Sequence, residues 1–373
     1  MESLTEFGMG PTWEALARFL HGASTVFFVT WSVLLWPQRN QNNVMRLLLA
    51  NMMFLAFCDL KDIVFLFDGM WENVYLTGIS VTVDLLYVPL MCSFFFEVVS
   101  PGVFSLKKLI PAMVMQGLFI PVYLFTACDY VYHIALLWAY GTGVVSMVMV
   151  FILSIRHTKY IRDNYSYTEY IDVSWLIRGG ACMLVCLTIF LLAFTDETYL
   201  SDSVYYFISI SVWVYLYVLT LRHKVVDTPP LSIFTLPVVA AANQPADATR
   251  SDLYEHIRTR LQVLMEQEKA FLNPKLTLQD VARDVGTNRT YLSEFLNNEL
   301  NVSFYEYVNR WRVKEACIII EKMTQDKSSV QNVAGLAGFN SVSTFNRSFL
   351  KEKGMTPTQY FRNISRQDLQ SCC

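Results

Sequence analysis

Seven long apolar stretches fill most of the first 225 residues, and they constrain the fold more than any other feature of the chain. They lie at 19–36, 44–67, 74–98, 109–127, 131–155, 175–194 and 203–221. A helix of about 20 apolar residues crosses ~30 Å of hydrocarbon, so each stretch is long enough to span a membrane. The tail ahead of the first stretch is acidic, which is atypical of a cleaved signal peptide. The sequence therefore predicts seven transmembrane helices in residues 1–225.

The basic residues between these stretches predict one orientation. Lys and Arg follow the first, third, fifth and seventh stretches, namely Arg39, Arg46, Lys107, Lys108, Arg156, Lys159, Arg162, Arg222 and Lys224. The alternate connections, 68–73, 128–130 and 195–203, contain neither. Because basic loops stay on the cytoplasmic side, we expect the N-terminus outside and the C-terminal domain in the cytoplasm. The expected location is the bacterial cytoplasmic (inner) membrane.

Several ionisable residues interrupt the apolar stretches. Asp59, Lys61 and Asp62 lie in the second stretch and Asp84 lies in the third. Charges inside a membrane are costly and often mark function, so Asp59, Lys61 and Asp84 form a candidate polar site for a ligand from outside. The alternative is an internal ion pair, such as Lys61 with Asp84, that only joins two helices. Prolines at 89, 111 and 121 are expected to kink their helices.

Residues that support catalysis or metal binding do not gather in recognisable patterns. The eight cysteines show no CxxC or Cys/His ligand spacing, and His21 and His133 belong to no paired-histidine motif. The terminal Cys372 and Cys373 do not form a CaaX prenylation signal. We therefore expect no catalytic residues, no metal, no cofactor and no enzymatic activity.

The chain changes character after residue 225. Residues 226–373 contain 17 Lys and Arg against 16 Asp and Glu, a balance that does not by itself indicate a nucleic-acid binder. Residues 226–250 are rich in Pro and small residues and are predicted to be a flexible linker. A leading helix is expected in 251–275. Its apolar stripe packs on its own domain or forms a short dimer contact, and consists of Leu253, Ile257, Leu261 and Leu264.

An internal near-repeat is the most specific pattern in the sequence. Val281 to Gly286 recurs in form as Val333 to Gly338, and each copy is an amphipathic segment that ends at a glycine. A second helical segment follows each glycine, at 288–297 and 341–351. This pattern predicts two helix-turn-helix units. The helix expected between them, Phe304 to Met323, would span ~30 Å, close to the ~34 Å between successive major grooves on one face of DNA.

The C-terminal residues resemble the DNA-binding domain of the AraC/XylS family, over roughly 276–363. The matching positions are Leu278 with Val281 and Ala282, Tyr291 to Ser293, Arg312 with Ala316, Gly338 and Phe339 with Phe345 and Phe349, Gly354 to Pro357, and Tyr360 to Arg362. The resemblance implies an all-helical domain at 276–366 that binds promoter DNA sequence-specifically through two helix-turn-helix units.

The same resemblance implies which side chains meet DNA. The groove-facing positions fall on Arg289, Thr290, Ser293 and Glu294 in the first unit, and on Val342, Ser343 and Arg347 in the second. Such side chains suit guanine, cytosine and thymine-methyl contacts. Lys351, Lys353 and Arg362 are expected to meet phosphates. Glu294 and Leu350 stand where the family often has a basic residue, so the base preference stays undetermined.

Taken together, the sequence predicts an all-α membrane-bound one-component transcription regulator whose membrane domain senses a signal. Two alternatives are a membrane transporter or enzyme that carries an autoregulatory DNA-binding domain, and a structural tether for DNA. The expected partners are double-stranded DNA and the lipid bilayer, while an unknown ligand, a homodimer and RNA polymerase stay open. A signal would act through dimer spacing, through the freedom of the linker, or through proteolytic release within 226–250.

Overall fold

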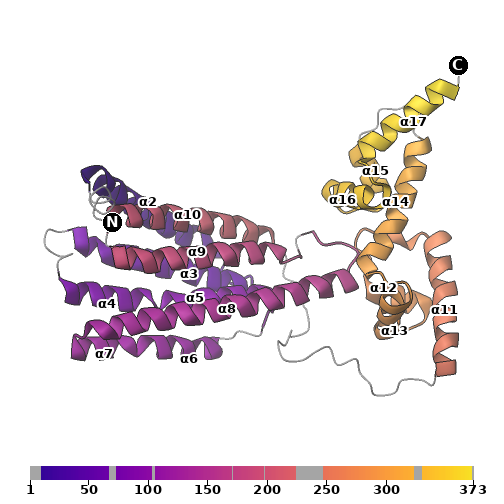
Figure 1. Ribbon diagram of the computed structural model, residues 1–373. Helices are drawn as coiled ribbons and strands as arrows, with labels where there is room; N and C mark the ends of the chain where they lie inside the picture. Colours follow the sequence, from indigo (N-terminus) through magenta and orange to yellow (C-terminus); the bar gives the residue numbers. More distant parts are fainter. Residues whose placement is uncertain are drawn as a thin grey trace. The chain divides into compact units, whose positions relative to one another are not determined.

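The computed structural model describes the chain over residues 10–66, 73–102, 106–169, 171–196, 198–223, 247–322 and 330–371. Every regular element in these ranges is a helix (Figure 1). The chain divides into two compact units. The bundle unit consists of Met1–His157 and Val173–Leu236, and the C-terminal unit consists of Thr158–Asp172 and Pro237–Cys373. Residues 226–246 of the predicted linker lie outside the described residues, and its last four residues, 247–250, are described.

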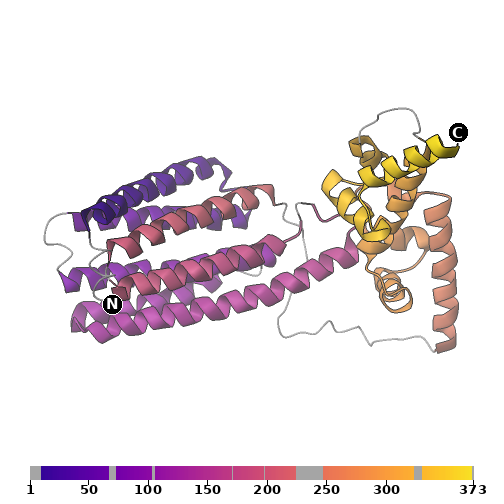
Figure 2. The ribbon, with the colours of Figure 1, turned by 45° about the horizontal axis from the view of Figure 1, so that its top comes forward.

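The bundle unit is built of helices that run side by side in both views (Figure 1 and Figure 2). In chain order they are α2 (Pro11–Leu35), η1 (Trp36–Gln38), α3 (Asn43–Lys61), η2 (Asp62–Leu66), α4 (Val74–Asp84), α5 (Tyr87–Val99), α6 (Leu106–Gly117), α7 (Phe119–Thr126), α8 (Asp129–Asn164), α9 (Ser174–Asp196) and α10 (Tyr199–Arg222). Helix α2 packs against α3 and α10, α10 against α9, and α3 against α5. One continuous apolar cluster, which includes Leu48, Phe94 and Trp213, fills the space between them.

Within the described residues, six helices are long and apolar enough to cross a membrane. They are Pro11–Gln38, Val74–Val99, Leu109–Thr126, Tyr130–Asn164, Ser174–Leu192 and Tyr199–Arg222. They match six of the seven predicted stretches. The other stretch, 44–67, forms α3 and η2, and the 19 residues of α3 include the charged Arg46, Asp59 and Lys61. A seventh span at α3 therefore stays a prediction.

Two of the three prolines follow breaks in their helices. The backbone turns at Leu85 and Leu86, between α4 and α5, and again at Leu118, between α6 and α7. Pro89 cannot donate a hydrogen bond to the carbonyl of Leu85, and Pro121 cannot donate one to Gly117, so the helical ladder is interrupted there. Pro111 lies inside α6 without such a break.

The C-terminal unit carries the two helix-turn-helix units. Its helices are α11 (Asp247–Glu266), η3 (Ala270–Leu272), α12 (Leu278–Val285), α13 (Arg289–Glu294), η4 (Phe295–Glu299), α14 (Phe304–Lys322), α15 (Val330–Leu336), α16 (Val342–Lys353) and α17 (Pro357–Ser371). The pairs α12–α13 and α15–α16 form the two helix-turn-helix units, and α14 runs from one pair to the other (Figure 1). The last seven residues of α8, from Thr158 to Asn164, also belong to this unit.

Each helix-turn-helix unit has its own apolar core, and α14 contributes to both. Phe304 and Val308 of α14 join the first core, whereas Val313 and Ile320 join the second. Helix α11 packs on the first core through Ile257, Leu261 and Leu264, which are at most 3% exposed, with Leu253 partly buried beside them. The stripe of α11 is thus used within its own domain, and it is not available for a dimer contact.

Local signals explain why each helix starts and stops where it does. Thr277 and Asp280 form a reciprocal capping box at α12, and the side chains of Asn288 and Ser341 cap α13 and α16. Gly286 ends α12 in the left-handed conformation, at φ 79°. Side-chain caps satisfy backbone N–H groups that have no partner inside the helix.

We expect Thr277→Ala to destabilise α12 by about 0.5–2 kcal/mol, because the N-terminal amide of Asp280 loses its acceptor. Hydrogen exchange of α12 in the full-length protein measures this loss. Thr259→Ala is the matched control, since Thr259 lies exposed within α11 and its hydroxyl donates to the carbonyl of Glu255 in the preceding turn. Equal exchange in the two variants would contradict the capping role.

Candidate nucleic-acid interface

Helix α13 presents the first set of predicted DNA contacts. Asn288 accepts a hydrogen bond from the amide of Tyr291 at 2.9 Å, which fixes the start of the helix. Leu292 turns into the core, so Arg289 and Thr290 are exposed on the opposite side and Ser293 is half-buried. These three residues share an accessible face. The guanidinium of Arg289 lies 5.5 Å from the ring centre of Tyr160, a residue of the Thr158–Asp172 segment.

Glu294 is engaged inside the domain. Its carboxylate pairs with Arg250 of α11 at 3.1 Å, and the same guanidinium donates to the hydroxyl of Tyr254. A carboxylate held by arginine is a weaker acceptor for a cytosine amino group than a free one would be. The prediction that Glu294 reads a base therefore requires that this ion pair opens first.

Helix α16 presents the second set. Ser341 caps the helix through Thr344, and Phe345 and Phe349 are fully buried on its inner side. On the outer side, Ser343 and Arg347 are exposed and Val342 is half-buried. The structure thus places the three predicted base-reading side chains of this unit on one accessible side of α16.

The predicted phosphate contacts differ in their surroundings. Lys351 pairs with Glu306 of α14, and this hydrogen bond holds the pKa of Glu306 below its ordinary value. The ammonium of Lys353 lies 6.0 Å from the ring centre of Tyr360, and Arg362 is exposed. Lys351 must therefore exchange Glu306 for a phosphate, whereas Arg362 is already accessible on the surface.

Helix α14 sets the spacing of the two units. Its 19 residues correspond to about 28 Å of helix. The first core takes residues from its beginning and the second core takes residues from its end. This length is consistent with the expectation that one chain reaches two successive major grooves, which stays a prediction.

A buried arginine on α14 was not singled out for this role by the sequence reasoning. Arg312 is 1% exposed, and its N–H groups donate to oxygen atoms of four residues. The acceptors are the carbonyls of Phe271 (2.8 Å), Asn273 (2.8 Å) and Ser166 (2.9 Å), the hydroxyl of Ser166 (3.0 Å) and the side chain of Asn309 (3.2 Å). Burial lowers the pKa of Arg312 to about 10, so the guanidinium stays charged at neutral pH.

Glu169 is a second residue that the sequence reasoning missed. Its carboxylate accepts hydrogen bonds from the hydroxyls of Ser341 (2.8 Å) and Thr344 and from the side chain of Asn340 (3.4 Å). Burial raises the pKa of Glu169, but these hydrogen bonds outweigh it and hold the pKa below its ordinary value. The only hint in the sequence is the polar run from Asn164 to Asp172, which is longer than a tight connection between two helices requires.

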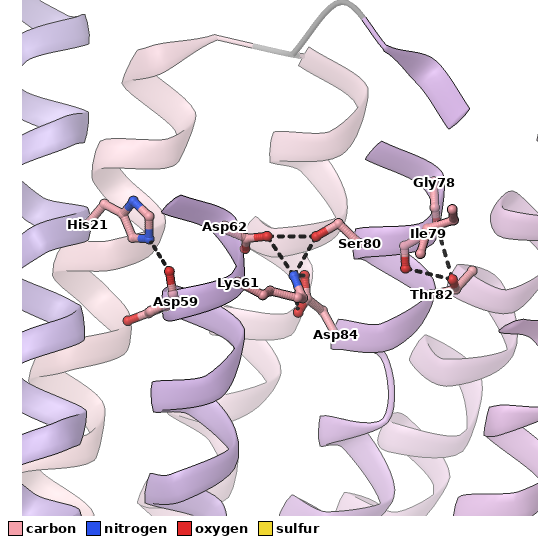
Figure 3. Close-up of polar contacts among 9 residues, drawn as sticks. All are labelled: His21, Asp59, Lys61, Asp62, Gly78, Ile79, Ser80, Thr82 and Asp84. Atoms are coloured by element: carbon pink, nitrogen blue, oxygen red, sulfur yellow. Dashed lines mark hydrogen bonds and ion pairs between the residues drawn. The ribbon is translucent and has the colours of Figure 1, made fainter. Parts of the chain in front are cut away.

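Polar residues also meet within the bundle unit (Figure 3). Lys61 of α3 contacts Asp62 at 2.6 Å, Asp84 of α4 at 2.9 Å and the hydroxyl of Ser80, which in turn donates to Asp62 at 2.6 Å. The pair of Lys61 and Asp84 joins α3 to α4, as the ion-pair alternative predicts. Asp62 is therefore part of this cluster.

Asp59 does not share the contacts of Lys61. Its backbone carbonyl lies 2.9 Å from Nε2 of His21 in α2, while its side chain points away from Lys61 in Figure 3. One carboxylate oxygen, Oδ2, is buried without a hydrogen-bond partner among the described residues. The predicted trio is thus split into an ion pair, Lys61 with Asp84, and a separate Asp59. A ligand site at these residues stays a prediction.

Comparisons with known proteins agree with this geometry. Residues 263–363 match the family model described as a helix-turn-helix domain. The chain is 29% identical over 127 residues to the uncharacterized HTH-type transcriptional regulator YtdP of Bacillus subtilis (strain 168), covering 34% of this chain and 15% of that protein. It is 25% identical over 120 residues to the raffinose operon transcriptional regulatory protein RafR of Pediococcus pentosaceus, covering 32% of this chain and 42% of that protein.

A third relative is the melibiose operon regulatory protein of Escherichia coli (strain K12), which is 30% identical over 96 residues, or 26% of this chain and 30% of that protein. The chain thus spans less than half of the length of these three relatives. The first two are transcriptional regulators by name, and the third is an operon regulatory protein by name. Residues 263–363 form an AraC-type helix-turn-helix domain, in a chain whose described N-terminal part has six helices that are long and apolar enough to cross a membrane.

Proposed function

We propose that the protein is a membrane-bound one-component transcription regulator. Its C-terminal unit binds promoter DNA through α13 and α16, and its bundle unit senses a signal. The observation that carries the proposal is the pair of capped second helices, each with an exposed arginine, attached to one joining helix α14. Two reading helices in one unit are what contact with two successive grooves requires.

The proposed orientation rests on the distribution of basic residues. Arg39 and Arg46, Arg156 and Arg162, and Arg222 follow alternate spans, and the connections on the other side contain neither Lys nor Arg. By the positive-inside rule the C-terminal unit faces the cytoplasm of a bacterial inner membrane, where the chromosome is accessible. The signal is proposed to enter through the bundle unit, because charged residues are costly inside a membrane and often mark function. The candidate residues are Lys61, Asp84 and Asp59.

The test is genome-wide mapping of DNA crosslinked to the intact membrane-resident protein, followed by affinity measurements on the strongest site. We expect discrete peaks from the wild type. Arg347→Ala is expected to weaken binding to that site by about 1–3 kcal/mol, or roughly 5- to 150-fold, because a base-edge contact is lost.

The matched control is Arg258→Ala. Arg258 is an exposed arginine on α11 that lies over the ring of Phe295, and it is not one of the predicted DNA contacts. Its replacement removes the same charge, and we expect the affinity to change less than about threefold. Equal losses in the two variants, or an absence of discrete wild-type peaks, would contradict sequence-specific binding through α16.

A further inference from the structure

The end of α8 and the connection that leads from it to α9 belong to the C-terminal unit. Thr158–Asp172, here called the 158–172 segment, is part of the C-terminal unit. The carbonyl and the hydroxyl of Ser166 in this segment accept hydrogen bonds from the buried Arg312. The amide of Ser166 donates to the carbonyl of Leu276 at 3.1 Å. Tyr165 forms an isolated antiparallel bridge with Thr277. The segment is therefore fixed to the first helix-turn-helix unit and to α14 by backbone and side-chain bonds.

Beyond this attachment, the segment covers the start of α16. Glu169 binds the capping hydroxyl of Ser341 and the hydroxyl of Thr344, the third residue of the helix, together with the side chain of Asn340. Thr344 is only 2% exposed as a result of its position between the core and this carboxylate. The Glu169 carboxylate thus accepts hydrogen bonds from polar side chains at the N-terminus of α16, where the helix dipole favours negative charge.

The segment also contacts the first reading helix. The ring of Tyr160 lies against the guanidinium of Arg289, at 5.5 Å from the ring centre. Arg289 is the one predicted base-reading arginine of α13. A single short stretch of chain therefore engages one predicted DNA contact of the first unit and the helix N-terminus of the second.

DNA needs the same groups. A helix-turn-helix protein inserts the N-terminal part of its reading helix into the major groove, which brings the phosphates beside the groove close to the start of that helix. A phosphate oxygen and the Glu169 carboxylate are both anions and cannot share the hydroxyls of Ser341 and Thr344. A carboxylate held there would also repel the phosphates, because like charges at short distance disfavour each other.

We infer that the 158–172 segment is an internal competitor of DNA, which holds the two reading helices in a state of low affinity until it is displaced. This inference rests on the proposed function and names its regulation. The apparent affinity for DNA is then the intrinsic affinity multiplied by the fraction of molecules whose segment has left. Because the segment directly connects α8 and α9, two helices long and apolar enough to span a membrane, a signal that moves either helix changes this fraction without any enzymatic step.

The test uses full-length protein in lipid nanodiscs and a labelled duplex that carries the strongest mapped site, with a scrambled duplex beside it. Glu169→Gln removes the carboxylate charge and keeps the side-chain size. We expect the Glu169→Gln protein to bind the specific duplex at least about tenfold more tightly than the wild type does. This factor corresponds to the free energy of the hydrogen bonds that the charged carboxylate accepts.

Glu352→Gln is the matched control. Glu352 lies exposed on α16 and pairs with Arg310 at 3.3 Å, so its replacement removes one negative charge, as Glu169→Gln does, but from the second reading helix and without touching the segment. We expect a change of less than about threefold, which is the effect of net charge alone. A second readout requires no substitution: DNA added to the wild type is expected to increase hydrogen exchange in residues 165–169 while it protects α16.

The outcomes are distinct. Tighter binding of Glu169→Gln than of Glu352→Gln, together with release of residues 165–169 by DNA, supports the competitor. Weaker or equal binding of Glu169→Gln, with the segment still protected in the DNA complex, overturns it and makes the segment a permanent anchor. If every variant binds the specific and scrambled duplexes equally, the proposed function itself fails and the competitor fails with it.

Discussion

Replacing Arg312 with methionine is expected to lower the free energy of unfolding of the C-terminal unit by about 3–5 kcal/mol. The guanidinium satisfies the buried carbonyls of Phe271 and Asn273 and both oxygens of Ser166. Methionine fills similar space but donates no hydrogen bond. Each acceptor left without a partner costs about 1–3 kcal/mol, reduced where water can enter.

Native-state hydrogen exchange of α14 in the full-length protein measures this loss. Arg312→Lys is the informative comparison, because lysine keeps the charge but has three donors on a point-like ammonium and cannot reach all of these oxygens together. We expect its loss of stability to lie between those of the wild type and Arg312→Met. If Arg312→Met is as stable as the wild type, the hydrogen bonds do not hold the unit together.

The second large effect is expected from Gly338→Ala, with a loss of about 2–5 kcal/mol. Gly338 has φ +85°, and an added Cβ would lie 2.7 Å from both the Cα of Leu272 and the carbonyl oxygen of Phe271. Both are backbone atoms of η3, so a side-chain rotation cannot relieve the overlap. The turn of the second helix-turn-helix unit would have to move away from the first unit.

Gly286→Ala separates conformational strain from overlap. Gly286 has φ +79°, but its added Cβ would meet only the ring of His256, at 3.9 Å. We expect a loss of about 1–2 kcal/mol, the cost of a left-handed backbone for an L-residue. Urea unfolding of the full-length protein followed through the C-terminal unit compares the two variants. Equal losses would show that the approach of Gly338 to η3 contributes nothing.

The two helix-turn-helix units could be predicted because their signals are local. A cap residue, a 3- and 4-spaced apolar stripe and a glycine all lie within about ten residues of each other, as in Thr277 to Gly286. Whether α13 and α16 expose the predicted side chains also follows from helical spacing. The identity of the DNA-contacting residues stays a prediction, because helix geometry does not select a base.

The polar partners could not be predicted, because they depend on how distant elements meet. Arg250 lies 44 residues from Glu294, and Lys351 lies 45 residues from Glu306. Periodicity places each residue on a face but does not show which face lies opposite. The same reason separates Asp59 from the Lys61 and Asp84 pair, since the position of a residue along a helix does not determine the rotation of that helix about its axis.

The separation of 146 residues between Ser166 and Arg312 also orders the events of synthesis. The first core uses residues 254–308 and can close as soon as that length has left the ribosome. Ser166 is made long before Arg312, and α9 and α10 are synthesised between the two. A newly made chain therefore contains every residue of the first core before Arg312, further along α14, has emerged to hold the 158–172 segment, so the reading helices of a nascent chain mature in sequence, first α13 and then α16.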